Sequence, residues 1–268
     1  MRVKLLLLII LSGTSGFSQD NQKFFFGVNV GTKIANKNYA TRYDGRYNNE
    51  LEQMLINNTN AYYQIYTLLG NKDFYLPYDF YPQRIKYSPG IVTGVLAGYQ
   101  LSPNLQASID ANFISLTIKN KFSVVVIDPA NQTSQNQYEL GDLYGKESRF
   151  NGKFNFDYVS DGEKAKYIIG LSGIFSAWRM DQHVATFPSG NGYALQLYSR
   201  HNPLNNITSK VSGMGWGVGV NLGIEYRLSP KFVGQLIYQP QSVYLDFGYD
   251  PMKIIRLQHD IILRILWK

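Results

Sequence analysis

The sequence predicts an all-β fold of eight antiparallel strands in up-and-down order. Three observations lead to this prediction: apolar and polar residues alternate over eight stretches, short and long connections alternate between them, and Tyr, Phe and Gly are abundant. Alternation with a period of two is typical of a strand whose two faces meet different environments. We expect strands at 24–34, 91–101, 105–113, 150–158, 167–178, 214–228, 232–247 and 255–267.

The stretch 214–228 shows the pattern most clearly. Every even-numbered residue in it is apolar or aromatic, whereas the odd positions carry four glycines with Asn221, Glu225 and Arg227. The final stretch likewise opposes Asp260 and Arg264 to a row of apolar residues. Each strand is therefore expected to have one apolar face and one face of small, polar and charged residues.

The connections predict which strand ends lie together. Short links fall at 102–104, 160–165 and 229–231, and the remaining connections are 35–89, 119–148, 188–211 and 248–253. Because the two kinds alternate, all short turns are expected at one end of the molecule. The sequence Leu-Ser-Pro occurs in two of these turns, where serine and proline suit the start of a type I turn. The nearby Tyr99, Tyr158 and Tyr226 then indicate an aromatic girdle, unless they reflect only the β-propensity of tyrosine.

Residues 1–19 are predicted to be a signal peptide that is removed on export. Arg2 and Lys4 precede an apolar run at 5–11, and small residues follow as far as Ser18. A buried N-terminal helix is the alternative. The mature chain, 20–268, is expected to form a single domain. It contains no cysteine, which excludes disulfides and thiol chemistry.

Two closed arrangements fit eight alternating strands. A soluble lipocalin-like barrel would place the apolar face inside, and a transmembrane barrel would place it outside. Glycines mixed with opposed charges suit a narrow interior. The apolar face is nearly unbroken over strands of about 9–11 residues, which are long enough to cross a bilayer when tilted. A closed ring also satisfies the backbone polar groups in lipid. We therefore predict an eight-stranded antiparallel up-and-down transmembrane β-barrel with long extracellular loops.

The mature chain resembles the small eight-stranded outer-membrane β-barrel proteins of Gram-negative bacteria. The resemblance rests on the signal peptide, the eight alternating strands, the short turns opposite long loops and the final strand "IIRLQHDIILRILWK" with Trp267. It implies an integral protein of the cell outer membrane. The expected partners are outer-membrane lipids, lipopolysaccharide and other outer-membrane proteins, and no nucleic acid.

Charged residues on the polar faces predict a charge network in the lumen. Opposed charges in a narrow interior favour an ion-paired plug, and an ion-selective conduit is the alternative. The expected members are Asp110, Lys153, Asp157, Glu225, Arg227, Arg256, Asp260 and Arg264. Ring closure should also bring Lys33 of the first strand close to the charges of the last strand.

The histidines do not indicate an enzyme. His183, His201 and His259 do not stand in a pattern with serine that predicts hydrolysis, and we interpret Asp181 with His183 as structural. No catalytic residue, metal ligand or cofactor is expected. A lipid-modifying outer-membrane enzyme therefore stays a secondary alternative.

The first long connection is the most unusual segment. Apolar residues between Leu51 and Leu69 fall at helical spacing, and Gly70 suits a helix end, so one loop is expected to carry a short helix. Aromatic residues then follow among prolines, which indicates either a cap on the barrel mouth or a protein-binding surface. The predicted partner-binding residues are Tyr75, Tyr78, Phe80 and Tyr81. The sequence thus predicts a non-enzymatic accessory or structural subunit of a larger membrane complex, with a narrow channel as the alternative.

Overall fold

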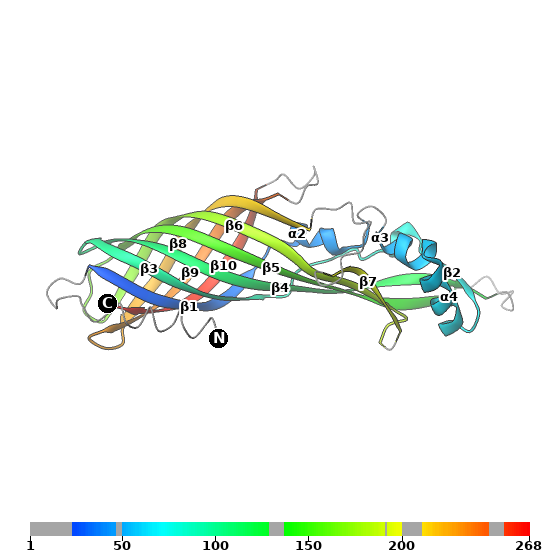
Figure 1. The fold of residues 1–268 in the computed structure, drawn as a ribbon. Helices are drawn as coiled ribbons and strands as arrows, with labels where there is room; N and C mark the ends of the chain where they lie inside the picture. Colours follow the sequence, from blue (N-terminus) through cyan, green and yellow to red (C-terminus); the bar gives the residue numbers. More distant parts are fainter. Residues whose placement is uncertain (1–22, 47–49, 129–136, 191, 200–210, 247–254) are drawn as a thin grey trace, which may run out of the picture.

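The computed structural model describes residues 23–46, 50–128, 137–190, 192–199, 211–246 and 255–268, and its eight long strands form a closed antiparallel ring (Figure 1). Ring closure comes from the pairing of the first strand with the last, and from the pairing of β4 with β5. The predicted barrel is confirmed. Its strands are β1 (Phe24–Ile34), β3 (Gly90–Ser102), β4 (Leu105–Ile127), β5 (Gln137–Val159), β6 (Ala165–Phe187), β8 (Ser212–Arg227), β9 (Phe232–Leu245) and β10 (Arg256–Trp267).

The short connections lie at one end of the barrel, as predicted. In both Leu-Ser-Pro turns the serine side chain accepts backbone hydrogen bonds: Ser102 Oγ from the N–H of Leu105 at 3.2 Å, and Ser229 Oγ from that of Phe232 at 3.1 Å. The repeated sequence therefore performs the same capping role twice on one rim. Above this rim, Tyr158 and Tyr226 point outward and are about half exposed.

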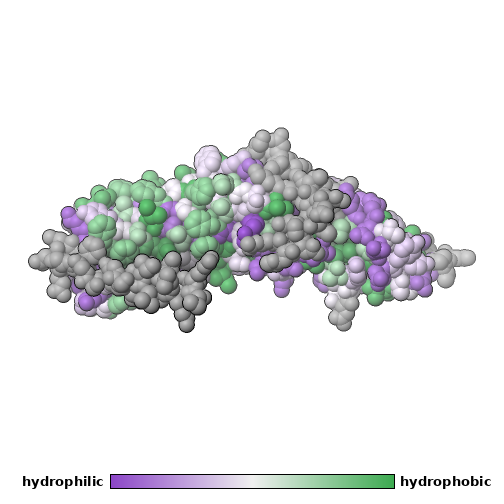
Figure 2. All heavy atoms as spheres, in the orientation of Figure 1, coloured by the Kyte–Doolittle hydropathy of each residue, from purple (hydrophilic) through white to green (hydrophobic). Residues whose placement is uncertain are grey.

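The outer surface of the barrel is an apolar band that faces the membrane. Exposed fractions reach 63% at Ile109, 62% at Phe113 and 61% at Trp216, whereas the alternate residues of the same strands point into the barrel. Figure 2 shows hydrophobic residues spread over the barrel and hydrophilic ones gathered toward the opposite end of the molecule. No helix among the described residues is long and apolar enough to cross a membrane.

Three strands continue far beyond the barrel, which corrects the predicted loop at 119–148. β4, β5 and β6 are each 23 residues long and stay paired above the membrane (Figure 1). Two short strands, β2 (Asp73–Tyr75) and β7 (Tyr193–Ser199), pair with the outer parts of β4 and β6. The result is a five-stranded sheet, in the order β2-β4-β5-β6-β7, standing on one side of the barrel mouth.

The two faces of these long strands exchange their chemistry at the membrane boundary. On β4 the even-numbered residues are polar and face the lumen as far as Asn112, and the odd-numbered residues up to Phe113 are apolar and face lipid. Above that point, buried apolar residues occupy the even positions at Ile114, Leu116, Ile118 and Phe122, while Lys119 and Lys121 are exposed at odd positions. Lipid solvates the outer face below and water above, so a continuous strand must reverse its pattern. The predicted loop was wrong because the alternation of apolar and polar residues reverses at the membrane boundary while the strands continue.

The first long connection packs on the inner face of this sheet. It contains helices α2 (Lys37–Ala40), η1 (Thr41–Tyr43), α3 (Glu50–Glu52), η3 (Gln53–Asn57), α4 (Thr59–Leu68) and η4 (Tyr78–Phe80). The expected helix is present: Asn58 caps α4 by accepting from the Ala61 N–H at 3.2 Å, and Gly70 takes a φ of 72° just past its end. Together with the sheet these segments form what we call the extracellular module.

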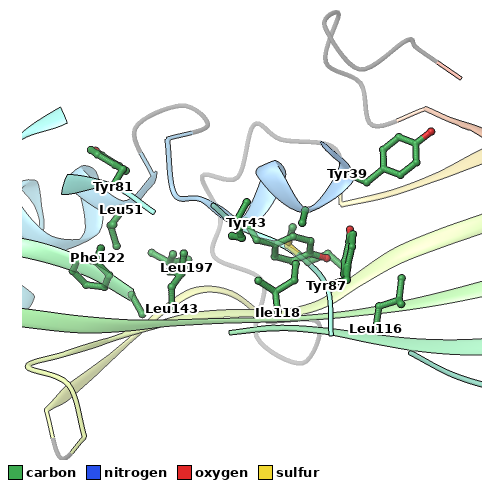
Figure 3. Close-up of a cluster of buried hydrophobic side chains, with 14 of the residues drawn as sticks. Tyr39, Tyr43, Leu51, Tyr81, Tyr87, Leu116, Ile118, Phe122, Leu143 and Leu197 are labelled. Atoms are coloured by element: carbon green, nitrogen blue, oxygen red, sulfur yellow. The ribbon is translucent and has the colours of Figure 1, made fainter. Parts of the chain in front are cut away.

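The extracellular module has a hydrophobic core of its own. Leu51, Leu55 and Ile65 from the helices are fully buried against residues of the long strands such as Phe122 and Leu143 (Figure 3). The ring of Phe122 lies over Gly141, where an added Cβ would stand 2.2 Å from the ring. The core continues down to the top of the barrel, which includes Ile114 and Trp178, so module and barrel are packed together.

Two sequence predictions fall outside the described residues. These are the signal peptide at 1–19 and the connection at 248–253.

Candidate functional site

The barrel lumen is filled in layers from one end to the other. At the end with the short turns, inward side chains form two small apolar clusters, one of them containing Phe25, Leu96 and Leu266. The middle of the lumen holds the polar and charged side chains, and the apolar core of the module begins above them. An eight-stranded barrel is only just wide enough for its own side chains, and here they occupy it throughout the described wall.

The first half of the central network places one carboxylate between two lysines. Asp260 lies directly opposite Lys33 in the pairing of the last and first strands, as their alternation predicts, and the two form an ion pair of 2.9 Å. The second oxygen of Asp260 pairs with Lys153 Nζ at 2.8 Å, and Lys153 also donates to the amide oxygen of Gln239. All these side chains are buried. Because two lysines face one carboxylate, this half carries one excess positive charge.

The second half reverses the ratio. Arg264 Nη2 binds Asp110 at 2.9 Å, and its Nη1 lies 3.9 Å from Asp157. One cation therefore faces two carboxylates, and the excess charge of this half is negative. The two halves together are neutral, which is the condition under which pairing can offset the desolvation of buried charges.

Neutral side chains connect the two halves. Asn155 donates to Asp110 at 3.0 Å and accepts from the Ser172 hydroxyl at 2.6 Å. Asn221 donates to Asp157 at 2.6 Å and accepts from Gln239 at 2.6 Å, and Gln239 is itself bound to Lys153. A continuous hydrogen-bonded layer therefore crosses the lumen from wall to wall.

The remaining members of the predicted network lie at the two rims. Glu225 is buried near the short turns, where it accepts from Lys268 at 2.9 Å and from Gln235 at 2.8 Å. Arg227, at the end of β8, is exposed, and Arg256, at the start of β10, is half-buried. The prediction placed both arginines in the lumen charge network. Arg227 does not join it, because its position at the end of β8 leaves it exposed to water, and Arg256 lies at the upper rim.

A group of tyrosines closes the upper mouth of the barrel. Tyr43 and Tyr87, both from the first long connection, donate to the same oxygen of Glu147 at 3.0 and 2.8 Å. Tyr39 donates to the Val243 carbonyl on the opposite wall. The close-up places Tyr43 and Tyr87 between the helical segment and the strands (Figure 3). Burial and the neighbouring Glu147 raise the pKa of Tyr43 and Tyr87 well above the usual 10.

The guanidinium of Arg149 completes this closure. Its Nε pairs with Glu147, its Nη1 donates to Gln258 at 2.9 Å, and the group lies 5.7 Å from the Tyr39 ring centre and 5.4 Å from that of Tyr87. We call Glu147, Arg149, Tyr39, Tyr43 and Tyr87 the mouth cluster. None of its charged residues was among the predicted network. Their signal in the sequence was the charged segment "YGKESR" at 144–149, which directly precedes the alternating strand at 150–158.

The described histidines occupy structural positions. β6 contains an extra residue at Asp181, which shifts the register, so that buried positions are even before it and odd after it. His183 therefore points inward, with its ring 5.4 Å from that of Tyr43, whereas Asp181 binds Ser148 and Arg179. His259 stacks on Tyr238 on the lipid-facing side. His201 is outside the described residues.

Within the described ranges, His, Asp and Glu side chains form no group of three that could hold a metal ion.

The four predicted partner-binding aromatics do not form a single surface. Tyr75 and Tyr78 are exposed, at 44% and 72%, and Phe80 is half-buried with its ring 5.3 Å from that of Tyr138. Tyr81 is only 4% exposed and packs in the module core. Its position is a correction to the prediction: a short 3-10 helix turns the chain at Tyr78–Phe80 and directs Tyr81 inward.

Comparisons with known proteins give low-identity matches to solved structures. No protein-family model matches the chain, and no curated protein matches it. Neisserial surface protein A (NspA) matches over 92% of this chain and 97% of its own, with 10% identity and a TM-score of 0.41. The translocator domain of the autotransporter NalP from Neisseria meningitidis matches over 100% and 96%, with 8% identity and a TM-score of 0.21.

A third solved structure, the CymD monoaromatic hydrocarbon channel, matches over 93% of this chain and 88% of its own, with 8% identity and a TM-score of 0.21. The fold class itself rests on the closed ring of eight strands, its outward apolar band and its filled polar interior. The chain therefore has the architecture of a small eight-stranded outer-membrane β-barrel.

Proposed function

We propose that the chain is a non-enzymatic integral outer-membrane protein that holds a folded extracellular module. In this proposal the module contacts another outer-membrane protein, and the chain is an accessory or structural subunit of a larger complex. The observation that carries the proposal is the continuation of β4, β5 and β6 as one packed unit above the membrane. A barrel of this size needs no such sheet to be stable in lipid.

The surface best suited to a protein partner lies at the outer end of the module. Tyr75 and Tyr138 flank Val125 across three paired strands, and Phe80 packs against Tyr138 from the neighbouring turn. Tyr78, two residues before Phe80, has its ring 6.1 Å from that of Tyr81 and the Arg46 guanidinium 5.0 Å from its ring centre. We call Tyr75, Tyr78, Phe80 and Tyr138 the aromatic patch.

The composition of the aromatic patch favours protein contact. Tyrosine, phenylalanine and arginine are enriched in the cores of protein interfaces, and exposed Leu140 and Ile127 extend the apolar area. These residues point away from the module core and lie far along the strands from the lipid-facing band. A water-exposed apolar cluster that has no binding partner tends to cause aggregation.

The filled lumen favours this role over transport. A conducting pathway would have to open both the central network and the mouth cluster. Opening them would separate buried ion pairs in each. Breaking one partner from a buried pair typically costs about 3–5 kcal/mol.

Site-specific photo-cross-linking in intact cells tests the proposal. A photoreactive phenylalanine analogue at Tyr78 or Tyr75 should give a discrete adduct with one outer-membrane protein, identified by mass spectrometry. The same analogue at Tyr167, a lipid-facing tyrosine that is 69% exposed, is the matched control and should give none. Tyr78→Ala combined with Tyr138→Ala should remove that protein from a mild-detergent purification. Equal adducts at Tyr167 and Tyr78, or none at either patch position, would contradict the proposal.

A further inference from the structure

The outward face of the three long strands changes in a regular order just above the lipid-facing band. Phe113 and Phe150, whose rings are 5.3 Å apart, mark the upper edge of the band on β4 and β5. The next outward pair is Ser115 with Ser148. This face is the direct continuation of the surface that contacts the membrane.

Two lysines follow on the same face. Thr117 is paired with Lys146, and Lys119 with Tyr144, so the two lysines are diagonal neighbours, about 7–8 Å apart. Both are exposed. An anion that lies between them can interact with both charges at once.

Neither lysine has an acidic partner in the part of the chain that the structure describes. Nearby cations differ in this respect: Lys121 lies 4.0 Å from Asp142, and Arg179 lies 3.2 Å from Asp181. Lys119 and Lys146 form no ion pair within 4.0 Å with the described residues. The unpaired charge is therefore confined to one position on the face.

We propose that Lys119 and Lys146 bind the phosphate groups of an outer-leaflet lipopolysaccharide whose acyl chains lie against the band below. The charges are complementary, and the lysines stand directly above the established lipid contact. This site is separate from the aromatic patch, so it does not depend on the proposed protein contact.

The height of the lysines selects the kind of lipid. Lys146 is four residues above Phe150, and Lys119 is six above Phe113. At roughly 3.3 Å per residue and a strand tilt of about 40°, they stand about 10 and 15 Å above the aromatic edge. A phospholipid head group layer is only about 5–8 Å thick. The phosphorylated sugars of lipopolysaccharide extend further, and the ring of Tyr144, beside Lys119, can stack on a sugar.

The experiment measures binding of defined lipids to the refolded full chain in detergent by native mass spectrometry. The probes are a rough-type lipopolysaccharide, the same lipid after dephosphorylation, phosphatidylglycerol and inorganic phosphate. The variant is Lys119→Gln with Lys146→Gln. The matched control removes two exposed lysines at the opposite rim, Lys164→Gln with Lys231→Gln. Folding of each variant is checked by heat-modifiable gel migration.

We expect the variant to bind lipopolysaccharide about 10- to 30-fold more weakly, as for the loss of two surface lysines near anionic lipid. The control should bind like the wild type, and dephosphorylated lipid should bind weakly to all three. Three results would overturn the proposal. The control could lose as much lipopolysaccharide binding as the variant, or the variant could lose as much binding to phosphatidylglycerol as to lipopolysaccharide. The third is that inorganic phosphate competes as well as the lipid. Cross-linking at Tyr78 should be unchanged in the variant, which separates this site from the protein contact.

Discussion

Single charged residues in the lumen are sensitive points of this barrel because each belongs to a closed balance. Asp260 serves two lysines, and Arg264 serves two aspartates. Removing one residue leaves a buried charge without compensation, whereas removing an apolar side chain from the lipid face leaves a space that lipid can fill.

The first prediction compares neighbouring residues on opposite faces of β10. Asp260→Leu should destabilise the barrel by about 3–5 kcal/mol, because Lys33 and Lys153 stay buried without their anion. Ile261→Ala, on the lipid face, should have a smaller effect. The assay is the temperature at which the compact band on unheated gels converts to the unfolded one. A larger loss of stability for Ile261→Ala would mean that the faces are reversed.

The second prediction concerns pH and the mouth cluster. The raised pKa of Tyr43 and Tyr87 means that both stay protonated in the folded protein when they would ionise at about pH 10 in the unfolded chain. The unfolded state then loses these protons first, so stability should fall as the pH rises above 10. Below pH 10 the two groups should cause no pH dependence.

Tyrosinate absorbance at 295 nm checks this prediction. In Tyr43→Phe with Tyr87→Phe, the folded titration up to pH 12 should match that of the wild type, whereas the denatured titration should lose the signal of two tyrosines. Loss of signal from the folded protein near pH 10 would show that the two hydroxyls are not shielded.

At the scale of the elements, the long strands act as one structure in two solvents. The inner face of β4 is polar where it faces the lumen and apolar where it supports the module. The glycines of β5 make this possible, because Gly141 and Gly145 leave space for the rings of Phe122 and Tyr43. The barrel ring also closes through its own strand pairing, so we expect it to stay folded when the core of the module is weakened.

The third prediction tests that separation. Phe122→Ala should destabilise the module by about 3–5 kcal/mol, because a large buried ring is lost from its core. The barrel below should stay folded. The expected result is faster cleavage within the first long connection by an added protease, with unchanged heat-modifiable migration.

Lys121→Ala is the matched control, because Lys121 is the adjacent residue on the exposed face. If both variants are cleaved at the wild-type rate, the module does not depend on this core.

At the scale of the whole molecule, ring closure and the alternating connections place the short turns at one end of the barrel and the module at the other. The two Leu-Ser-Pro turns share one rim, and the module stands at the other (Figure 1). The same closure leaves a lumen that is filled by its own side chains.

The fourth prediction concerns orientation. The chain has no cysteine, so single introduced cysteines are unique labels. Asp79→Cys, in the module, should react with a membrane-impermeant maleimide on intact cells. Asn104→Cys and Lys231→Cys, in the short turns, should react only after the outer membrane is permeabilised. Labelling of residue 104 on intact cells would reverse the orientation.

The fifth prediction concerns transport. The purified protein should give no unitary conductance in planar bilayers. Asp260→Leu is a poor test of this point because it destabilises the wall, so the measurement is made on the wild type. Steady single-channel currents from the wild type would favour the narrow channel.

Much of the barrel could be predicted from the sequence, because lipid imposes a strict period of two on every membrane-facing strand. The eight strands, the short turns and the pairing of Asp260 with the first strand all follow from that period and from ring closure. The position of Asp110, Lys153, Asp157, Asp260 and Arg264 inside the lumen follows from parity. What parity could not provide is depth, and for this reason the prediction did not separate Arg227 and Arg256, which lie at the rims, from the central charges.

The helix α4 could be predicted from the sequence, but the tertiary structure decided how the segments above the membrane pack. Where water replaces lipid outside the strands, the outward residues become polar and the inward residues become apolar. A strand that crosses this boundary therefore changes its alternation, and the change resembles the end of the strand. The core of the module joins Leu51 and Ile65 to Phe122 and Leu143, residues far apart in the chain. Only the three-dimensional packing brings them together, because contacts of such separation depend on strand pairing and helix placement that no local pattern specifies.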